Sequence, residues 1–274
     1  MLGDLLANVR KKKPLIHTIT TYVTANDCAN MVIACGAAPI MADDPAEAAQ
    51  VTSICAGLDI NLGTLTERKA QSMHLAGIRS NELQHPVILD PVGVGASSFR
   101  RETVARLLKD VRFTAIRGNI SEVRTIADAV EEHPRGVDAD RALAVTEETL
   151  DRAVEEIKGY ALKLKTVVAV TGAIDIVTDG ERAFVIRNGH PMLSDVTGTG
   201  CQLSALVAAF CAANPGSVLE ATAEAVCAMG LAGQIAHTRM TEQDGNATYR
   251  NYVIDAIYNM TPEDLERGAN YEVR

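Results

Sequence analysis

The chain has 274 residues, of which 47% are hydrophobic and only 4% aromatic, with no tryptophan. Its formal net charge of -9 at pH 7 opposes binding to a nucleic-acid backbone or an anionic membrane, so we expect neither partner and favour small-molecule ligands. A chain of this length that is rich in small aliphatic side chains predicts one layered α/β domain over residues 1–274.

The lengths of the apolar stretches and the spacing of the cysteines predict the cellular compartment and argue against two kinds of site. The apolar stretches fall short of the roughly 20 residues that span a bilayer. No charged-then-apolar leader opens the sequence, so we expect a cytoplasmic protein. The six cysteines include no Cys-x-x-Cys pair, which argues against a zinc site or a redox dithiol.

Strands and helices alternate through the first two thirds of the chain. Short aliphatic runs flanked by polar residues predict strands over 57–61, 86–89, 111–116 and 166–170. Between them, helical patterns lie near 66–80, 101–109, 121–130 and 147–164. Residues 174–178 and 183–186, joined by a Gly-containing turn, predict a hairpin. This order predicts a mainly parallel sheet that is covered by helices on both faces.

The last third of the chain is different, because residues 201–213, 218–238 and 248–259 all have helical patterns. The middle one is apolar around most of its circumference, so these helices should pack against the sheet or another subunit. The polar stretch 131–140 is the only plausible insertion, and nothing divides the chain into two domains.

The segment Asp195-Val-Thr-Gly-Thr-Gly-Cys201 precedes an apolar helix. Its glycines, Gly198 and Gly200, allow backbone N–H groups to converge at the positive end of the helix, where they can bind phosphate. A glycine-rich loop that merely enters a core helix explains the same letters, so the surrounding residues must decide.

Polar side chains follow three of the predicted strands, at the edge where open parallel sheets bind ligands. Asp90 is suited to Mg2+ or its waters, although it could simply cap the turn before Pro91. After the next strand, Glu122 could orient hydrated magnesium and Arg117 neutralise nucleotide phosphate. A helix-capping motif explains Asn119 and Glu122 equally well, and Thr171 at the end of residues 166–170 is a weak signal alone.

These clusters, taken in order, resemble the hydroxyethylthiazole kinases of thiamin salvage, which belong to the ribokinase-like superfamily. The resemblance covers nearly the whole chain. It rests on residues 14–30, 36–41, 61–65, 87–99, 115–122, 168–172 and 188–201. It implies a three-layer α/β/α fold that phosphorylates the hydroxyl of 4-methyl-5-(2-hydroxyethyl)thiazole with ATP and Mg2+, in a homotrimer whose active sites lie between subunits.

The resemblance also implies roles for single residues. Asp90 and Glu122 correspond to the magnesium-side acids, and Arg117, Thr171 and Asn119 are assigned to ATP. Met41 and Thr21 are assigned to the thiazole, together with Gly198 and Cys201. Catalysis is assigned to the turn itself, through Gly198, Gly200 and Cys201.

Two positions stand out against these patterns. Thr21 stands where the family usually has Asn near the thiazole. Cys201 stands where most ribokinase-like enzymes carry a catalytic Asp, and we interpret it as a partner of the substrate hydroxyl and a weak base.

Other functions fit less well. A vitamin kinase for a pyrimidine or pyridoxal alcohol, or a related ATP-dependent repair dehydratase, would usually carry Asp at position 201. Gly93-Val-Gly95 and Gly198-Thr-Gly200 both lack the third glycine of a dinucleotide-binding fingerprint, and no P-loop motif occurs. A nucleotide sensor without turnover is disfavoured because Asp90, Glu122 and Cys201 occur together.

Overall fold

The computed structural model describes residues 3–129 and 145–274, so the possible insertion at 131–140 lies outside the described residues. Within the described part, nine strands form one sheet in the order β2-β1-β3-β4-β5-β6-β7-β8-β9. The strands are β1 (Leu15–Ile19), β2 (Ala38–Ile40), β3 (Gly57–Asn61), β4 (Val87–Asp90), β5 (Ala115–Gly118), β6 (Val167–Val170), β7 (Asp175–Thr178), β8 (Ala183–Ile186) and β9 (Tyr271–Val273).

The first six strands pair in parallel, and the last three are antiparallel to their neighbours. Every residue of β3, β4 and β6 is buried, because a strand covered on both faces has no solvent side. The aliphatic character of β4 and β6 agrees with this, whereas β3 also buries the polar side chains of Asp59 and Asn61. The carboxyl ends of the parallel strands therefore share one edge of the sheet.

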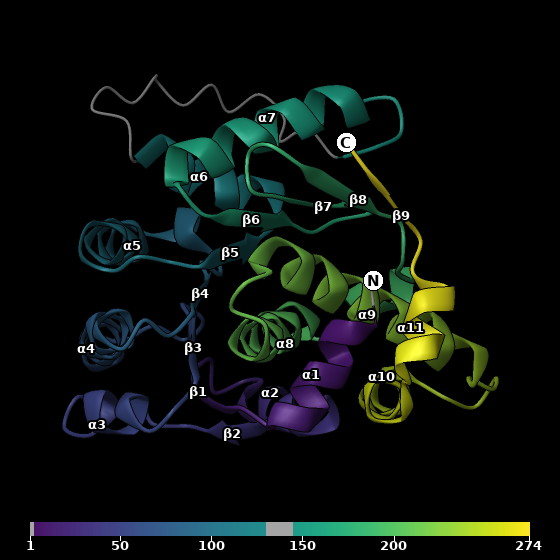
Figure 1. Ribbon diagram of the computed structural model, residues 1–274, viewed down its shortest axis with the longest axis horizontal. Helices are drawn as coiled ribbons and strands as arrows, with labels where there is room; N and C mark the ends of the chain where they lie inside the picture. Colours follow the sequence, from purple (N-terminus) through teal and green to yellow (C-terminus); the bar gives the residue numbers. More distant parts are fainter. Residues whose placement is uncertain (1–2, 130–144) are drawn as a thin grey trace.

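Helices cover both faces of this sheet (Figure 1). Those packed along one face are α4 (Glu67–Glu82), α5 (Ser98–Asp110), α6 (Ile120–Ala129) and α7 (Leu150–Leu164), with α3 (Ala48–Ser53) against α4. The other face carries α2 (Ala25–Ala34), α8 (Thr199–Ala213) and α9 (Val218–Thr238), and outside them lie α1 (Asp4–Lys12), α10 (Asn246–Asn259) and α11 (Pro262–Gly268). Two short 3-10 helices, Val94–Ala96 and Pro191–Asp195, complete the described elements.

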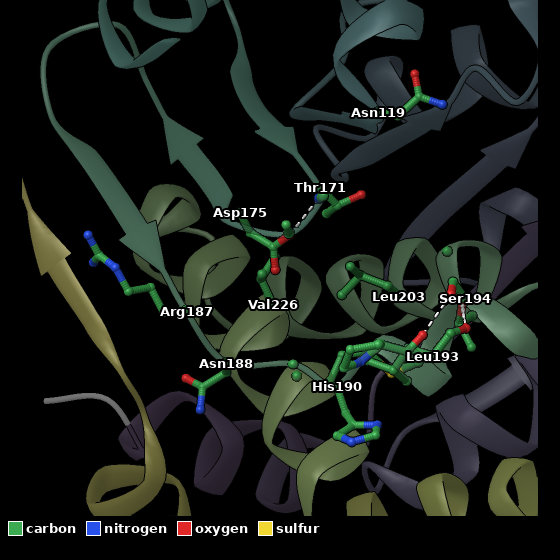
Figure 2. Close-up of a pocket in the computed structure, with 18 of the residues that line it drawn as sticks. Asn119, Thr171, Asp175, Arg187, Asn188, His190, Leu193, Ser194, Leu203 and Val226 are labelled. Carbon is green, nitrogen blue, oxygen red and sulfur yellow. Dashed lines mark hydrogen bonds between the residues drawn. The ribbon is translucent and has the colours of Figure 1, made fainter. Parts of the chain in front are cut away.

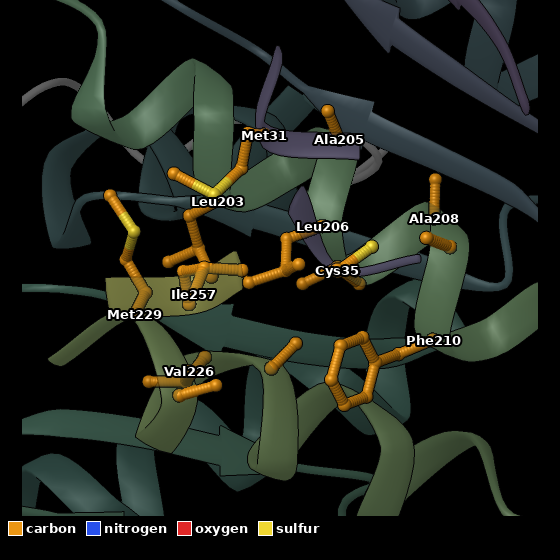
Figure 3. Close-up of a cluster of buried hydrophobic side chains, with 14 of the residues drawn as sticks. Met31, Cys35, Leu203, Ala205, Leu206, Ala208, Phe210, Val226, Met229 and Ile257 are labelled. Atoms are coloured by element: carbon orange, nitrogen blue, oxygen red, sulfur yellow. The ribbon is translucent and has the colours of Figure 1, made fainter. Parts of the chain in front are cut away.

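The two apolar helices α8 and α9 form the centre of the larger core. Figure 3 shows Leu203, Leu206 and Phe210 of α8 in one buried cluster with Val226 and Met229 of α9. Within the described residues, α9 alone is long and apolar enough to cross a membrane by length and composition. However, 72% of its apolar window is buried inside the molecule, as expected for a core helix.

The structure confirms most of the predicted elements. Residues 57–61 and 218–238 have the predicted bounds, and the hairpin forms as β7 and β8. The C-terminal helices α8 and α9 pack against the sheet, which resolves the alternative left open for them. The strand predicted at 111–116 is wrong in its bounds, because Val111 ends α5 by bonding the Leu107 carbonyl and the strand begins only at Ala115.

Candidate active site

Four neighbouring parallel strands bring polar residues to the same edge of the sheet. β3 ends at Asn61 and β4 at Asp90, and these two residues are register partners. β5 carries Arg117, and Thr171 follows β6 directly. Because all four strands run in the same direction, residues separated by more than 100 positions in sequence meet in one place.

Asp90 lies at the centre of this group and is fully buried. Its Oδ2 accepts hydrogen bonds of 2.8 Å from both Asn61 Nδ2 and Ser204 Oγ, and Arg117 Nη1 lies 3.7 Å away. Burial raises the pKa of Asp90 to about 6, against the opposing effects of Arg117, Ser204 and Asn61. Its Oδ1 is buried and has no hydrogen-bond partner among the described residues.

Arg117 joins Asp90 to the other strand ends. Its Nη2 donates a 2.6 Å hydrogen bond to Thr171 Oγ1, and the guanidinium lies so close to Gly200 that a Cβ there would come within 2.3 Å of Nη1. The position of Gly200 therefore has to be a glycine for Arg117 to occupy this place. A cation is thus placed directly beside the first turn of α8.

The first turn of α8 has the geometry of an anion site. Gly198 precedes the helix with φ 84°, in the left-handed region, and a Cβ there would lie 2.0 Å from Thr24 Cγ2. The first N–H groups of a helix have no partner within it and carry the positive end of its dipole. Gly198 thus lets the chain turn sharply against Thr24 at the start of a helix whose first turn, at Gly200, is bordered by Arg117.

Cys201 is buried in the first turn of α8. Burial raises the pKa of its thiol to about 11, and the carboxylate of Asp90 raises it further, whereas Thr24, Asn61 and Arg117 lower it. The thiol is consequently protonated at neutral pH. This protonation state favours a hydrogen-bonding partner over a general base.

Glu122 and Asn119 form the helix cap that was the alternative explanation for them. Asn119 Oδ1 accepts the Glu122 N–H at 2.9 Å, and Glu122 Oε2 accepts the Asn119 N–H at 2.9 Å. Glu122 Oε1 additionally accepts the N–H of Gly93 at 2.8 Å, which joins the turn after β4 to the turn after β5. Both carboxylate oxygens of Glu122 are therefore engaged with backbone amides beside Asp90.

The two predicted thiazole contacts lie at different places. Thr21 packs against Gly63, where a Cβ would meet Thr21 Cβ at 2.6 Å and Asn61 Oδ1 at 2.9 Å, so it borders the strand-end group. Met41 follows the edge strand β2, is 38% exposed, and is separated from β3 by β1. The structure thus brings Thr21 to the group around Asp90 and leaves Met41 at the edge of the sheet.

A cavity of about 570 Å³ adjoins Arg117, Thr171, Asn119 and Gly200. Figure 2 shows that its lining combines apolar side chains from α8 and α9, Leu203 and Val226, with the polar side chains of Asp175, Arg187 and Asn188. A cavity of this size, lined by apolar side chains and by the two cations Arg117 and Arg187, suits an anionic ligand such as a nucleotide better than a small uncharged molecule.

Sequence reasoning missed several residues of this site. Asn61 ends a predicted strand, so the strand-end argument used for Asp90 applied to it as well. Ser204 and Thr24 lie inside or at the start of helices, and nothing in their local sequence points to Asp90 or Gly198. Asp175, at the start of β7, accepts the Gly172 N–H at 2.9 Å, and burial raises its pKa to about 7.

Comparison with known proteins identifies relatives that span almost the entire chain. Residues 6–263 match the Hydroxyethylthiazole kinase family. The chain is 53% identical to a hydroxyethylthiazole kinase of Clostridium acetobutylicum over 272 residues, or 99% of each chain. It is 46% identical to one from Clostridium beijerinckii, covering 97% of this chain and 95% of that protein.

Solved structures also match this chain over nearly its whole length. The structure of a hydroxyethylthiazole kinase protein from Pyrococcus horikoshii matches with a TM-score of 0.88 at 31% identity, over 100% of this chain and 98% of that one. A ribokinase-like superfamily protein from Enterococcus faecalis matches with a TM-score of 0.62 at 12% identity, over 98% and 95% of the chains. A pyridoxal kinase from Staphylococcus aureus matches with a TM-score of 0.59 at 14% identity, over 96% and 98%.

The last two identities support the fold alone, which is ribokinase-like, as predicted. The family match and the close relatives go further, because they span almost the entire chain. This protein belongs to the hydroxyethylthiazole kinase family.

Proposed function

We propose that the chain transfers the γ-phosphoryl group of ATP to the hydroxyl of 4-methyl-5-(2-hydroxyethyl)thiazole, in thiamin salvage. The observation that carries the phosphoryl transfer is the meeting of the α8 turn at Gly198 with Arg117, Thr171 and Asp90 at the strand ends. Membership of the family supplies the identity of the alcohol.

Phosphoryl transfer depends on aligning the attacking hydroxyl and neutralising charge on the transferred group more than on strong base catalysis. The N–H groups after Gly198 and the guanidinium of Arg117 are suited to that neutralisation. Thr171 and Asn119 line the cavity beside Arg117, which supports their assignment to ATP. Gly200 contributes by leaving room for Arg117.

The acceptor alcohol is assigned to the opposite side of the turn. Thr21, Gly198 and Cys201 are the contacts we propose for it, with Met41 as a contact of the thiazole ring. Because the thiol of Cys201 is protonated at neutral pH, its proposed role is to hold the substrate hydroxyl by a hydrogen bond while the hydroxyl attacks the phosphoryl group. The proton then leaves to phosphate oxygen or solvent.

Two acidic residues, Asp90 and Glu122, fit a magnesium ion. No group of three or more His, Cys, Asp or Glu side chains that could hold a metal occurs in the part of the chain that is described. The free Oδ1 of Asp90 is nevertheless suited to a cation or its water, and Glu122 lies beside it. Asp90 would hold Mg2+, which supplies charge neutralisation on the phosphates, while Glu122 orients the surrounding waters.

We further propose a cytoplasmic homotrimer with active sites between subunits, without nucleic-acid or membrane partners. Large apolar side chains are exposed in the segments around β1 and the edge strand β2, namely Tyr22 and Val23 after β1, Ile33 on α2, Met41 after β2, and Ile54 at the end of α3. Large exposed apolar side chains are a common feature of protein–protein contacts. A neighbouring subunit at this edge would cover Met41. Light scattering should give three times the mass of one chain.

The substrate is tested by incubating the purified protein with ATP and, separately, the thiazole alcohol, a hydroxymethylpyrimidine and pyridoxal. Pyridoxal is the main rival because pyridoxal kinases share the fold. Mass spectrometry should detect the phosphate ester of the thiazole alcohol as the dominant product. Absence of that ester, with another alcohol phosphorylated, would overturn the proposed substrate.

A further inference from the structure

Lys69 is a buried lysine on α4, with only 1% of its side chain exposed. Its Nζ donates a 2.8 Å hydrogen bond to the carbonyl oxygen of Thr20 and lies 3.4 Å from Thr64 Oγ1. The same ammonium lies 3.9 Å from the centre of the Tyr22 ring and 3.8 Å from the carboxylate of Asp43. One cation thus contacts segments that follow three different strands, β1, β2 and β3.

Such an arrangement has a free-energy cost that the fold must offset. An ammonium taken out of water needs hydrogen bonds and nearby negative charge or aromatic faces. Burial lowers the pKa of Lys69, whereas Asp43 raises it. An apolar side chain at this position would bury the same surface of α4 without the free-energy cost of desolvating a charge. Core packing therefore does not explain why a lysine contacts these loops.

The turn that Lys69 contacts runs over residues 20–24, between β1 and α2. Its far end touches the anion site, because Thr24 packs directly against Gly198. Its middle is closed by the Thr24 N–H on the Thr21 carbonyl at 3.2 Å. Its near side is joined to the turn after β3 by the Tyr22 N–H on Thr64 Oγ1, also at 3.2 Å.

We propose that Lys69 is a positioning residue for the acceptor alcohol, which holds the turn 20–24 against the residue 63–64 turn in the form that receives the substrate hydroxyl. This inference rests on the proposed function, and it adds a residue that touches neither substrate. Lys69 acts through the Thr20 carbonyl and the Tyr22 ring. ATP binds on the other side of the α8 turn, so Lys69 should affect the alcohol and leave ATP binding unchanged.

The first test is Lys69→Met, which keeps an unbranched stem and removes the charge and the hydrogen bonds. We expect the KM for the thiazole alcohol to rise about tenfold, while kcat and the KM for ATP change less than about twofold. Lys109→Met, at an exposed position on α5, is the matched control and should leave all three constants unchanged.

A general loss of stability has to be separated from lost positioning. Asn214→Ala removes buried hydrogen bonds to the Phe210 and Leu5 carbonyls at the far end of α8. This variant should lower the melting temperature without changing the KM for the alcohol. If Lys69→Met raises both Michaelis constants equally, or leaves that of the alcohol unchanged in a folded protein, the proposal is wrong.

Tyr22 gives a second test that does not depend on how well Lys69→Met folds. Tyr22 is 66% exposed, so its replacement should be tolerated by the fold. Tyr22→Leu removes the aromatic face and should raise the KM for the alcohol, whereas Tyr22→Phe keeps the face and should restore the native value. Equal behaviour of the two variants would contradict a role for the cation–ring contact.

Hydrogen exchange provides a readout that is independent of activity. In Lys69→Met the backbone amides of residues 20–24 should exchange faster, while those of β3 and α8 keep native rates. If the native protein does not phosphorylate the thiazole alcohol, the proposed function fails, and the exchange comparison still decides whether Lys69 holds the turn. Native exchange rates at residues 20–24 in the variant would refute the inference.

Discussion

Gly198 offers the sharpest test of the anion site, through the substitution Gly198→Ala. The residue has φ 84°, and a side chain in the left-handed region costs about 1 kcal/mol. The added Cβ would also lie 2.0 Å from Thr24 Cγ2 and 2.8 Å from Thr24 Cβ, so either the α8 turn or the residue 20–24 turn must move. A displacement of about 1 Å in a catalytic site is sufficient to reduce the rate about 100-fold.

We therefore expect Gly198→Ala to lower kcat/KM by at least about 100-fold, and Gly198→Val to abolish turnover. Product formation should be followed directly by chromatography of the phosphate ester, with thermal melting as a check on folding. Gly216→Ala is the control, because a Cβ at Gly216 meets nothing within 4 Å. Adding Thr24→Ser to Gly198→Ala removes the closest methyl group and should recover part of the activity.

Native steady-state kinetics for Gly198→Ala would refute the reasoning. They would mean that the left-handed turn and its contact with Thr24 are not needed for phosphate binding. Loss of activity together with loss of the folded state would instead locate the effect in stability, which the Thr24→Ser double variant distinguishes.

Three further predictions concern catalysis and stability. Cys201→Asp should keep or raise kcat, because a carboxylate is a better hydrogen-bond acceptor than a thiol with a pKa of about 11. A large loss of kcat in steady-state assays would contradict this prediction. A Cys201→Ser variant that works at the native rate would indicate that Cys201 has a packing role only. The pKa of the Asp175 carboxyl is raised to about 7 in the folded protein. The folded state therefore binds this proton more tightly than the unfolded chain does. As a result, ionisation of Asp175 lowers the free energy of unfolding as the pH rises from about 4 to 7. Asp175→Asn should accordingly raise the melting temperature relative to the native protein more at pH 8 than at pH 4, and an equal difference at both pH values would exclude this titration. Gly159 lies in the interior of α7, and a Cβ added there meets nothing within 4 Å. Gly159→Ala should therefore add about 0.5–1 kcal/mol to the free energy of unfolding, measured by urea denaturation. A lower denaturation midpoint than that of the native protein would contradict this prediction.

Local sequence patterns were sufficient for most of the fold. β3 and α9 could be delimited because each is a largely apolar segment of typical strand or helix length that is bounded by polar or turn-forming residues. The first strand and helix were harder to predict, because β1 and the turn after it are rich in threonine. The polar side chains of β1 look like a loop in sequence and are buried only in the folded protein, where α4 and α8 pack against this strand.

The site could be predicted in part for the same reason. Asp90, Arg117 and Thr171 follow recognisable strands, so the parallel sheet alone implies that they lie at one edge. Their assigned roles in binding and catalysis stay predictions, as do those of Met41 and Thr21. The capping motif at Asn119 and Glu122 is local as well, and both of its hydrogen bonds form.

Sequence alone determined the α/β class with a mainly parallel sheet and the glycine turn before α8, because each depends on patterns of residues that are close together in the chain, and it also determined the family, through motifs spread along nearly the whole chain. Only the tertiary structure decided that Gly198 abuts Thr24, that Arg117 fills the space left by Gly200, and that Lys69 reaches the turn after β1. Those contacts join segments from different strands, and their distances follow from how the helices pack on the sheet. The protonated state of Cys201 has the same origin, because burial among neighbours that are remote in sequence raises its pKa.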